Sequence, residues 1–519
     1  MSLAQKFALS VLAIQEEIID GCSPAQIRRL IQESDAIVSS LDLEIEALEF
    51  KLKELFTQRE RECAANAALR HLVAPVRSLP VELLTEIFVL SMHESSDHAE
   101  CRNSCIPNAY RISHVCSEWR HIAMGTPELW AGPLFVDLSL PFPSKFEEEL
   151  YTEGLRSWLA RSDPLPISIT LTLGEGWWMW NSNNHYSQRC VAEVIQVAFR
   201  WRSVHFPLEL PSFFIRELEG MGPLSSLEEL EMPEFVPDDL KFDPASITCF
   251  STASRLRKLT MESNCPIAMP WTQLTDITLL SDSISPDAAL DIFSQCTHLV
   301  RASVTSLPWY NTPTRSMVQL DYLRTLEIRF TDTALHNIWD YLSTPVLDDL
   351  GLFHEPMQLG GIEATFTAFQ LRSPDITKLG IYAHFSPETL KRIFLHSPSV
   401  THLVLGHTSD LDNNLLTALS YKADDPQPLL PRLHSLSVSG VSFAGNEEFL
   451  ASMIASRWWS DAELASRRTA PPAIAQWSEV MLGEGGRNDH FEYSSSFRNK
   501  MDDLRRTGLP VTIVSSPST

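Results

Sequence analysis

The chain has 519 residues, enough for roughly two to four domains. Apolar residues make up 44% and charged residues 21%, which is typical of a globular protein with a sizeable core. The 41 basic against 66 acidic side chains give a net charge of −25, which argues against a protein that binds nucleic acid or anionic lipid through phosphate contacts.

Neither a membrane span nor a secretion signal is expected. No apolar run approaches the ~18 residues that a bilayer crossing needs. The beginning of the sequence, MSLAQKFALSVLAIQEE, turns acidic without a small-residue cleavage site. The nine cysteines are odd in number and form no C-x-x-C pair, which is typical of reduced thiols. We therefore expect a cytoplasmic or nuclear protein.

A helical leader is expected over residues 1–34, followed by a coiled-coil-like helix over 35–72. Residues 24–36 predict a short helix of their own, capped by Ser23. In the second helix, six apolar side chains follow the spacing of a coiled-coil seam: Val38, Leu41, Ile45, Leu48, Leu52 and Leu55.

The seam is short, because Arg59 and Glu62 occupy the next seam positions and end it. It is then about 25 Å long, too short to hold a dimer by itself. Two interpretations therefore remain open. The first interpretation is self-association. The second is an amphipathic helix that folds back on its neighbours.

Two shorter helical patterns follow, separated by a polar stretch at 92–110. The first, within 75–91, begins at Pro80 and carries an apolar face. The second, within 111–126, is expected to be one helix that ends at Pro127. Cys116 lies in this second pattern, where we expect a buried and unreactive thiol.

This arrangement resembles the F-box, in the F-box-like form of basidiomycete fungi. The matching residues are Leu79, Pro80, Leu83, Leu84, Ile87, Phe88, Val115, Cys116, Trp119 and Arg120, followed by Pro127, Leu129 and Trp130. The resemblance implies a helical module over 73–131 that docks a Skp-type adaptor and, through it, a cullin-based ubiquitin ligase. The largely polar stretch of 19 residues at 92–110 departs from the short central link of the family.

The size of the module agrees with a docking role. About 55 residues are too few to bury all of its large apolar side chains, and leftover apolar surface is a candidate partner site. The alternative is that these side chains pack against the leader helix and the C-terminal domain.

No catalytic, cofactor-binding or metal-binding site is expected in the chain. His93, His98, Cys101 and Cys105 match no common zinc spacing, so the polar stretch is interpreted as a loop. No P-loop, G-x-S-x-G or H-E-x-x-H motif occurs. The tryptophans of 177–180 (WWMW) are interpreted as part of an irregular loop, the alternative being a sugar site of a hydrolase. We therefore expect no catalytic residue, no cofactor and no metal.

The region 132–519 carries nine copies of an L-x-x-L-x-L pattern, whose starts lie 18 to 33 residues apart. The copies start at Leu227, Leu256, Leu274, Leu299, Leu323, Leu347, Ile376, Val400 and Leu433. Helix starts are expected after Ser285, Thr333, Ser386 and Asp410. A polar loop is expected over 483–496, and a final helix and strand over 499–514. The pattern resembles leucine-rich repeats, which implies an irregular α/β solenoid with a C-terminal cap.

In such a solenoid the polar residues between the leucines line the concave face. The candidate target-binding residues there are Lys258, Arg301, Glu327, Lys378 and His402. Their mixed charge suits a protein target better than a phosphate-rich one.

The sequence thus predicts a non-enzymatic substrate-recognition subunit of a Skp-cullin-F-box type ubiquitin ligase. The F-box would dock the adaptor and the repeats would bind an unknown target protein. The alternative is a non-catalytic leucine-rich-repeat scaffold that is independent of any ubiquitin ligase.

Overall fold

The structure is a computed structural model. It describes residues 23–72, 75–93, 108–138, 144–172, 187–206, 212–232, 243, 246–261, 267–280, 285–306, 316–330, 338–354, 363–382, 385–406, 411–422, 427–440, 446–459, 475–484 and 492–515. The chain divides into two compact units, Met1–Leu90 and Ser91–Thr519. The module expected over 73–131 therefore has residues in both units.

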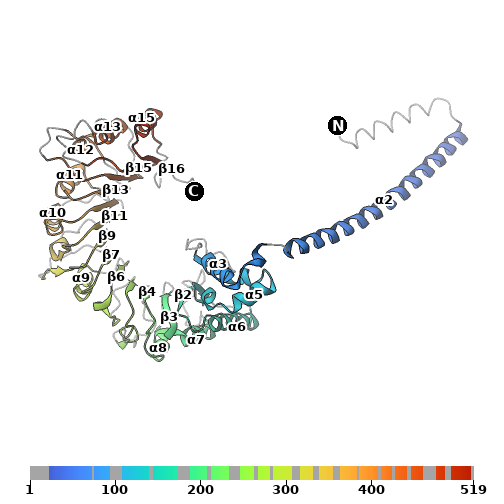
Figure 1. The fold of residues 1–519 in the computed structure, drawn as a ribbon, viewed down its shortest axis with the longest axis horizontal. Coiled ribbons are helices and arrows are strands. Elements are labelled where there is room, and N and C mark those ends of the chain that lie inside the picture. Colours follow the sequence, from blue (N-terminus) through green and yellow to red (C-terminus); the bar gives the residue numbers. More distant parts are fainter. Residues whose placement is uncertain are drawn as a thin grey trace. The chain divides into compact units, whose positions relative to one another are not determined.

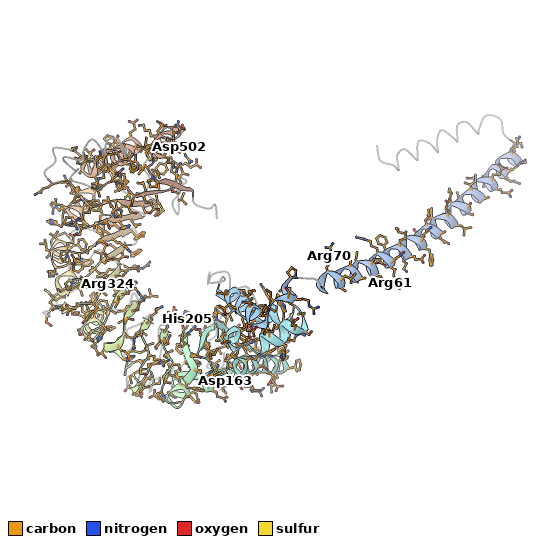
Figure 2. All side chains as sticks on the ribbon, viewed as in Figure 1. Arg61, Arg70, Asp163, His205, Arg324 and Asp502 are labelled. Atoms are coloured by element: carbon orange, nitrogen blue, oxygen red, sulfur yellow. The ribbon has the colours of Figure 1, made fainter. Side chains whose placement is uncertain are left out.

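The first unit contains one long helix, α2 (Pro24–Leu72), and a short 3-10 turn, η1 (Pro75–Ser78) (Figure 1). Two helices with a break near residue 36 were expected here. A single helix of 49 residues, about 73 Å long, replaces them because no glycine or proline interrupts the chain after Pro24. Every side chain described in α2 is exposed, and Figure 2 shows them standing out along the helix, Arg61 and Arg70 among them.

A helix that runs across the boundary of the two units, α3 (Val81–His93), follows η1. It begins as expected just after Pro80, whose carbonyl accepts hydrogen bonds from the backbone N–H groups of Leu83 and Leu84, both at 3.1 Å. Proline suits this position because a helix start needs no N–H from it.

The second unit begins with two helices where one was expected: α4 (Asn108–Ser113) and α5 (Ser117–Met124). The helix is interrupted because Cys116 takes an extended conformation and caps α5, its sulfur accepting from the backbone N–H of Trp119 at 3.4 Å. Cys116 is half-buried. The expectation of a thiol inside a buried helix face was therefore wrong.

Trp130, at the end of the 3-10 turn η3 (Pro127–Trp130), anchors this region to the rest of the second unit. It is fully buried and donates from its indole nitrogen to the carbonyl of Ala123 at 2.7 Å. Its ring lies 4.7 Å from that of Trp158, whose indole donates to the carbonyl of Trp130 at 2.8 Å. Trp130 therefore packs against the C-terminal domain, which was the alternative to its contributing to a partner site.

A parallel sheet of 14 strands forms most of the second unit, so the α/β class expected from the sequence is confirmed (Figure 1). Its strands follow one another in chain order: β1 (Leu134–Asp137), β2 (Ile167–Thr172), β3 (Trp201–His205), β4 (Glu229–Met232), β5 (Lys258–Met261), β6 (Asp276–Leu279), β7 (Arg301–Ser306), β9 (Thr325–Phe330), β11 (Asp349–His354), β12 (Lys378–Tyr382), β13 (His402–Gly406), β14 (Ser435–Ser439), β15 (Glu479–Glu484) and β16 (Val511–Ser515). Two further short strands, β8 (Val318–Gln319) and β10 (Leu342–Ser343), pair only with each other among the described residues.

Helices connect the strands and lie along the outer side of the curved sheet (Figure 1). They are α6 (Lys145–Arg161), α7 (Gln188–Gln196), α8 (Ser212–Glu219), α9 (Pro286–Gln295), α10 (Glu363–Arg372), α11 (Pro387–Leu395), α12 (Asn413–Leu419), α13 (Glu447–Ser456) and α15 (Ser495–Arg506). Short 3-10 turns stand in other connections: η5 (Ala198–Arg200), η7 (Trp271–Gln273) and η8 (Ile338–Tyr341).

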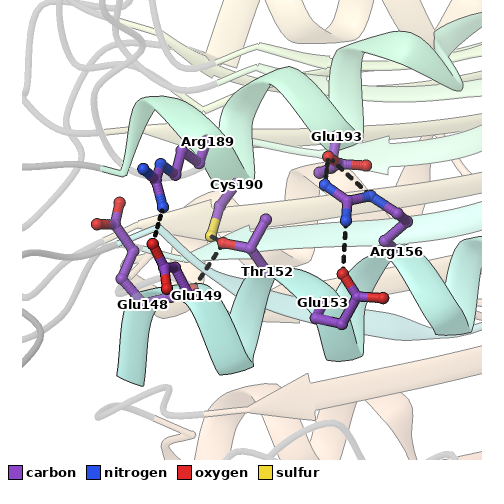
Figure 3. Close-up of polar contacts among 8 residues, drawn as sticks. All are labelled: Glu148, Glu149, Thr152, Glu153, Arg156, Arg189, Cys190 and Glu193. Carbon is purple, nitrogen blue, oxygen red and sulfur yellow. Dashed lines mark hydrogen bonds and ion pairs between the residues drawn. The ribbon is translucent and has the colours of Figure 1, made fainter. Parts of the chain in front are cut away.

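Neighbouring helices are joined by polar contacts, as α6 and α7 show (Figure 3). Arg156 lies between two carboxylates and contacts Glu153 at 2.5 Å and Glu193 at 2.6 Å. The hydroxyl of Thr152 and the thiol of Cys190 meet at 3.4 Å. Exposed ion pairs of this kind contribute little to stability, and the buried apolar faces of the helices supply most of it.

The expected helix starts were correct at two of four positions. Ser285 and Ser386 cap α9 and α11, each with proline at the first helical position. The start expected after Asp410 was wrong, because Asp412 caps α12 and its carboxylate accepts from the N–H of Leu415 at 2.8 Å. Thr333 lies outside the described residues, and the segment after it ends in the 3-10 turn η8.

At the C-terminal end, the expected final helix and strand are confirmed as α15 and β16. The loop expected over 483–496 was wrong at both ends. Gly483 and Glu484 belong to β15, and α15 begins at Ser495. Of the two adjacent tryptophans that follow α13, Trp459 is buried and Trp458 is half-buried.

Leucine rows on the helix side of the sheet form its core, because each strand alternates buried and more exposed residues. Leu326 is fully buried and lies in register with Ala302 and Leu350 of the adjacent strands. Glu327 lies on the opposite face.

Leu326→Ala should therefore lower the free energy of unfolding by about 2–5 kcal/mol, whereas Glu327→Ala should cost under about 1 kcal/mol. Urea unfolding of both variants measures the difference, and equal losses would contradict this register.

Candidate functional site

The first candidate surface is an exposed apolar stripe on α3. Leu83, Ile87 and Leu90 are 52%, 48% and 56% exposed and lie at i, i+4 and i+7 on one helix face. Leu84 and Phe88 are each only 2% exposed. The structure thus separates the predicted adaptor residues of α3 into a buried pair and a solvent-facing set.

The other predicted adaptor residues lie at the starts of helices. Leu79 is half-buried and Pro80 exposed, directly before α3. In the second unit, Val115 is 59% exposed in the turn before α5. Trp119 is half-buried and Arg120 exposed, both on α5.

The second candidate surface is the face of the sheet opposite the helices. Polar residues of ten neighbouring strands lie side by side there in one register, and we name this set the charge row: Glu229, Lys258, Asp276, Arg301, Thr325, Asp349, Lys378, His402, Ser435 and Glu479. Four of the five predicted target residues belong to it. The fifth, Glu327, lies two residues further along β9.

Opposite charges alternate along the charge row and pair with one another. The ammonium group of Lys258 lies 3.6 Å from the carboxylate of Glu229, and Arg301 forms an ion pair with Asp276. Burial raises the pKa of Asp349, and the neighbouring Lys378 opposes that rise. The lysines and the arginine predicted to bind a target therefore already have carboxylate neighbours, which makes the charge row a near-neutral polar surface.

His402 differs from the lysines and the arginine of the charge row. Burial, the ring of His434 and the charge of Lys378 all lower its pKa. The rings of His402 and His434 lie 4.8 Å apart, and the Nδ1 atom of His402 is 2.8 Å from the hydroxyl of Thr401. His402 is accordingly a neutral hydrogen-bonding side chain near pH 7.

A stacked aromatic pair lies beside the charge row, and the sequence analysis missed it. The rings of Phe353 and Tyr382 are 4.5 Å apart and nearly parallel. The Phe353 ring lies over Gly351 and the Tyr382 ring over Gly380. A β-carbon at either glycine would come to 3.0 Å from the ring above it. We name these four residues the ring platform. The repeated order of Gly, an apolar residue and an aromatic residue in two adjacent strands was the available signal.

Charged groups surround the ring platform. The guanidinium of Arg329 lies 5.2 Å from the centre of the Phe353 ring, a cation–π distance. Burial and the carboxylates of Glu327 and Asp349 raise the pKa of Tyr382. Phe353 and Tyr382 are both half-buried, and tyrosine and arginine are among the residue types enriched at protein-binding hot spots.

Among the described residues, the remaining features to consider are one pocket, the possible metal ligands and the buried thiols. A pocket of about 480 Å³ is lined by apolar side chains with only His396 and Gln427 as polar members. Within the described ranges, no three His, Cys, Asp or Glu residues are grouped to hold a metal ion. The thiols of Cys249 and Cys296 are buried, which raises the pKa of both. His98, Cys101, Cys105 and the tryptophans of 177–180 lie outside the described residues, as does the side chain of His93.

Of the helices that the structure describes, none combines the length and apolarity of a membrane span. No protein-family model and no curated protein matches this chain.

The glycines of the ring platform generate a prediction. Gly380→Ala should cost about 1–3 kcal/mol of unfolding free energy, because its β-carbon forces the Tyr382 ring away. In a Tyr382→Ala background the same change should be neutral or slightly stabilising, because nothing else crowds that position. Urea unfolding of the four proteins gives the coupling energy. Equal costs in both backgrounds would show that the ring does not lie over Gly380.

Proposed function

We propose that this chain is the substrate-recognition subunit of a Skp-cullin-F-box type ubiquitin ligase. The observation that carries the proposal is the exposed stripe of Leu83, Ile87 and Leu90, which directly follows the Leu79-Pro80 pair. The resemblance of these residues to the F-box supplies the identity of the partner, a Skp-type adaptor that links to a cullin.

The division of α3 into two faces supports docking by that helix. One face carries Leu84 and Phe88, which are already shielded from water. The other face leaves three large side chains about half in water. Full burial of a fully exposed side chain of this kind releases about 1.5–3 kcal/mol, so covering each of these half-exposed side chains releases on the order of 1 kcal/mol. A partner helix or groove that covers this stripe would therefore gain binding free energy without disturbing the fold.

The 14-stranded sheet is, in this proposal, a solenoid of irregular leucine-rich repeats. Its strict chain order, its parallel pairing and the helices on one side support that interpretation. The opposite face remains available to a target, with the charge row and the ring platform as its most distinctive features. A folded target with mixed charge would match this surface.

The proposed receptor acts by proximity and contributes no reacting group. It would hold target lysines close to a separate ubiquitin-conjugating enzyme, which raises their effective concentration. Such a role needs no cofactor and no metal, and it places the protein in the cytoplasm or nucleus.

Adaptor docking predicts a specific loss. Leu83→Asp plus Ile87→Asp should weaken binding of a purified Skp-type adaptor by at least about 100-fold, because two carboxylates must then lose their water. Titration calorimetry with the full chain measures the affinity, and circular dichroism checks that helicity is retained.

A matched control is present on α6, where Phe146 and Leu150 are 71% and 63% exposed at the same i, i+4 spacing. Phe146→Asp plus Leu150→Asp should leave adaptor binding unchanged. Adaptor binding that survives the α3 changes, or that fails equally with the α6 changes, would show that the stripe of α3 is not the docking face. No adaptor binding by the unchanged chain would argue instead for a scaffold that is independent of the ligase.

Target recognition by the sheet is tested by charge reversal. Arg301→Glu plus Lys378→Glu should change the set of proteins captured by the full chain, because each change also leaves Asp276 or Asp349 beside a new carboxylate. The matched control, Lys391→Glu plus Arg432→Glu, alters exposed cations outside the charge row. Quantitative mass spectrometry compares the captured proteins. If both variants capture the same proteins as the unchanged chain, recognition lies on another surface.

A further inference from the structure

We propose that α2 pairs with α2 of a second copy of this chain to form a two-stranded coiled coil. The inference is independent of the adaptor and of the target surface. It starts from the exposure of the seam residues of α2: Val38, Leu41, Ile45, Leu48, Leu52 and Leu55 are 51% to 61% exposed. None of the described residues of the first unit covers them.

The seam is longer than the six-residue pattern, because the helix continues without a break on both sides of it. One heptad before Val38, Ile31 occupies an equivalent position and is 53% exposed. From Ile31 to Leu55 the seam then spans about 36 Å, or about three and a half heptads. That length reaches the three to four heptads that sustain a coiled coil.

The residue types at the seam indicate a copy of the same helix as the partner. Ile31, Val38, Ile45 and Leu52 occupy the first apolar position of each heptad, and the second is held by Leu41, Leu48 and Leu55. Three of the four first positions are β-branched, and in a parallel coiled coil β-branched residues there with leucine at the second position favour two strands. Such a seam is complementary to itself, since each layer meets its own equivalent in the second copy.

The apolar surface that pairing of the two α2 helices would cover agrees with a dimer of moderate stability. Pairing would remove seven apolar side chains from water on each helix, all of them about half exposed at present. Two features limit the affinity. Ser34 is a polar seam residue near one end, and Glu44 of one helix would face Glu49 of the other, a like-charge pair.

The ends of the seam define the paired segment. Arg59 and Glu62 stand at the next two seam positions, where each would meet its own like charge in the second copy. Pairing therefore stops before the helix reaches Leu72. In this arrangement the two copies are joined well ahead of η1 and α3, so that dimer formation does not use the exposed stripe of α3.

Sedimentation equilibrium of the full chain over a range of concentrations tests the proposal. The expected mass is twice the 58.5 kDa of one chain. Ile45→Asn plus Leu48→Asn should weaken association at least about tenfold, because both residues face the seam. The mass of one chain at all concentrations, or a mass of three or four chains, would overturn the proposal.

The control uses the same helix, where Leu43 and Phe50 are 69% and 73% exposed but lie off the seam. Leu43→Asn plus Phe50→Asn removes a comparable apolar surface and introduces the same residues, so both variants lose helix propensity alike. This control should remain dimeric. Equal weakening in the two variants would show that the apolar surface as a whole, and not the seam, drives association.

Discussion

The second unit depends on one constraint: no single strand with its helix can bury its own leucines. Each row of buried side chains is completed by the same row in the next strand, as Leu326 is by Leu350. Stability therefore arises from stacking, and every strand must keep the same register. This same register brings the charge row and the ring platform together, because residues opposite the leucines are fixed as soon as the leucines are aligned.

Much of this fold was predictable, because a leucine row leaves a periodic trace in the sequence. The nine expected patterns all lead into strands of the sheet. Strands β3 and β15 escaped notice because aromatic residues replace the first leucine of the pattern. Trp201 and Trp477 are buried at the positions that Leu227 and Leu433 occupy in the adjacent strands. A larger ring fills the same space, so that burial is kept while the pattern is lost.

The candidate sites were less predictable, because they depend on what lies beside each residue. The sequence identified Lys258 and Arg301 but not their ion pairs with Glu229 and Asp276, which depend on the lateral register. The ring platform was missed because the space above Gly351 and Gly380 is filled by the rings of Phe353 and Tyr382, which lie two residues further along each strand. On α3, periodicity predicted a wide apolar face, but only the structure separates Leu83 and Ile87 from the buried Leu84 and Phe88.

The central claim is that the exposed face of α3 docks a Skp-type adaptor. Hydrogen–deuterium exchange of the full chain, with and without purified adaptor, tests it most directly because exchange reports local protection along the backbone. We predict slower exchange within Val81–His93 on adaptor binding, with the strands that carry the charge row unchanged. Unchanged exchange in α3 under saturating adaptor would contradict the claim.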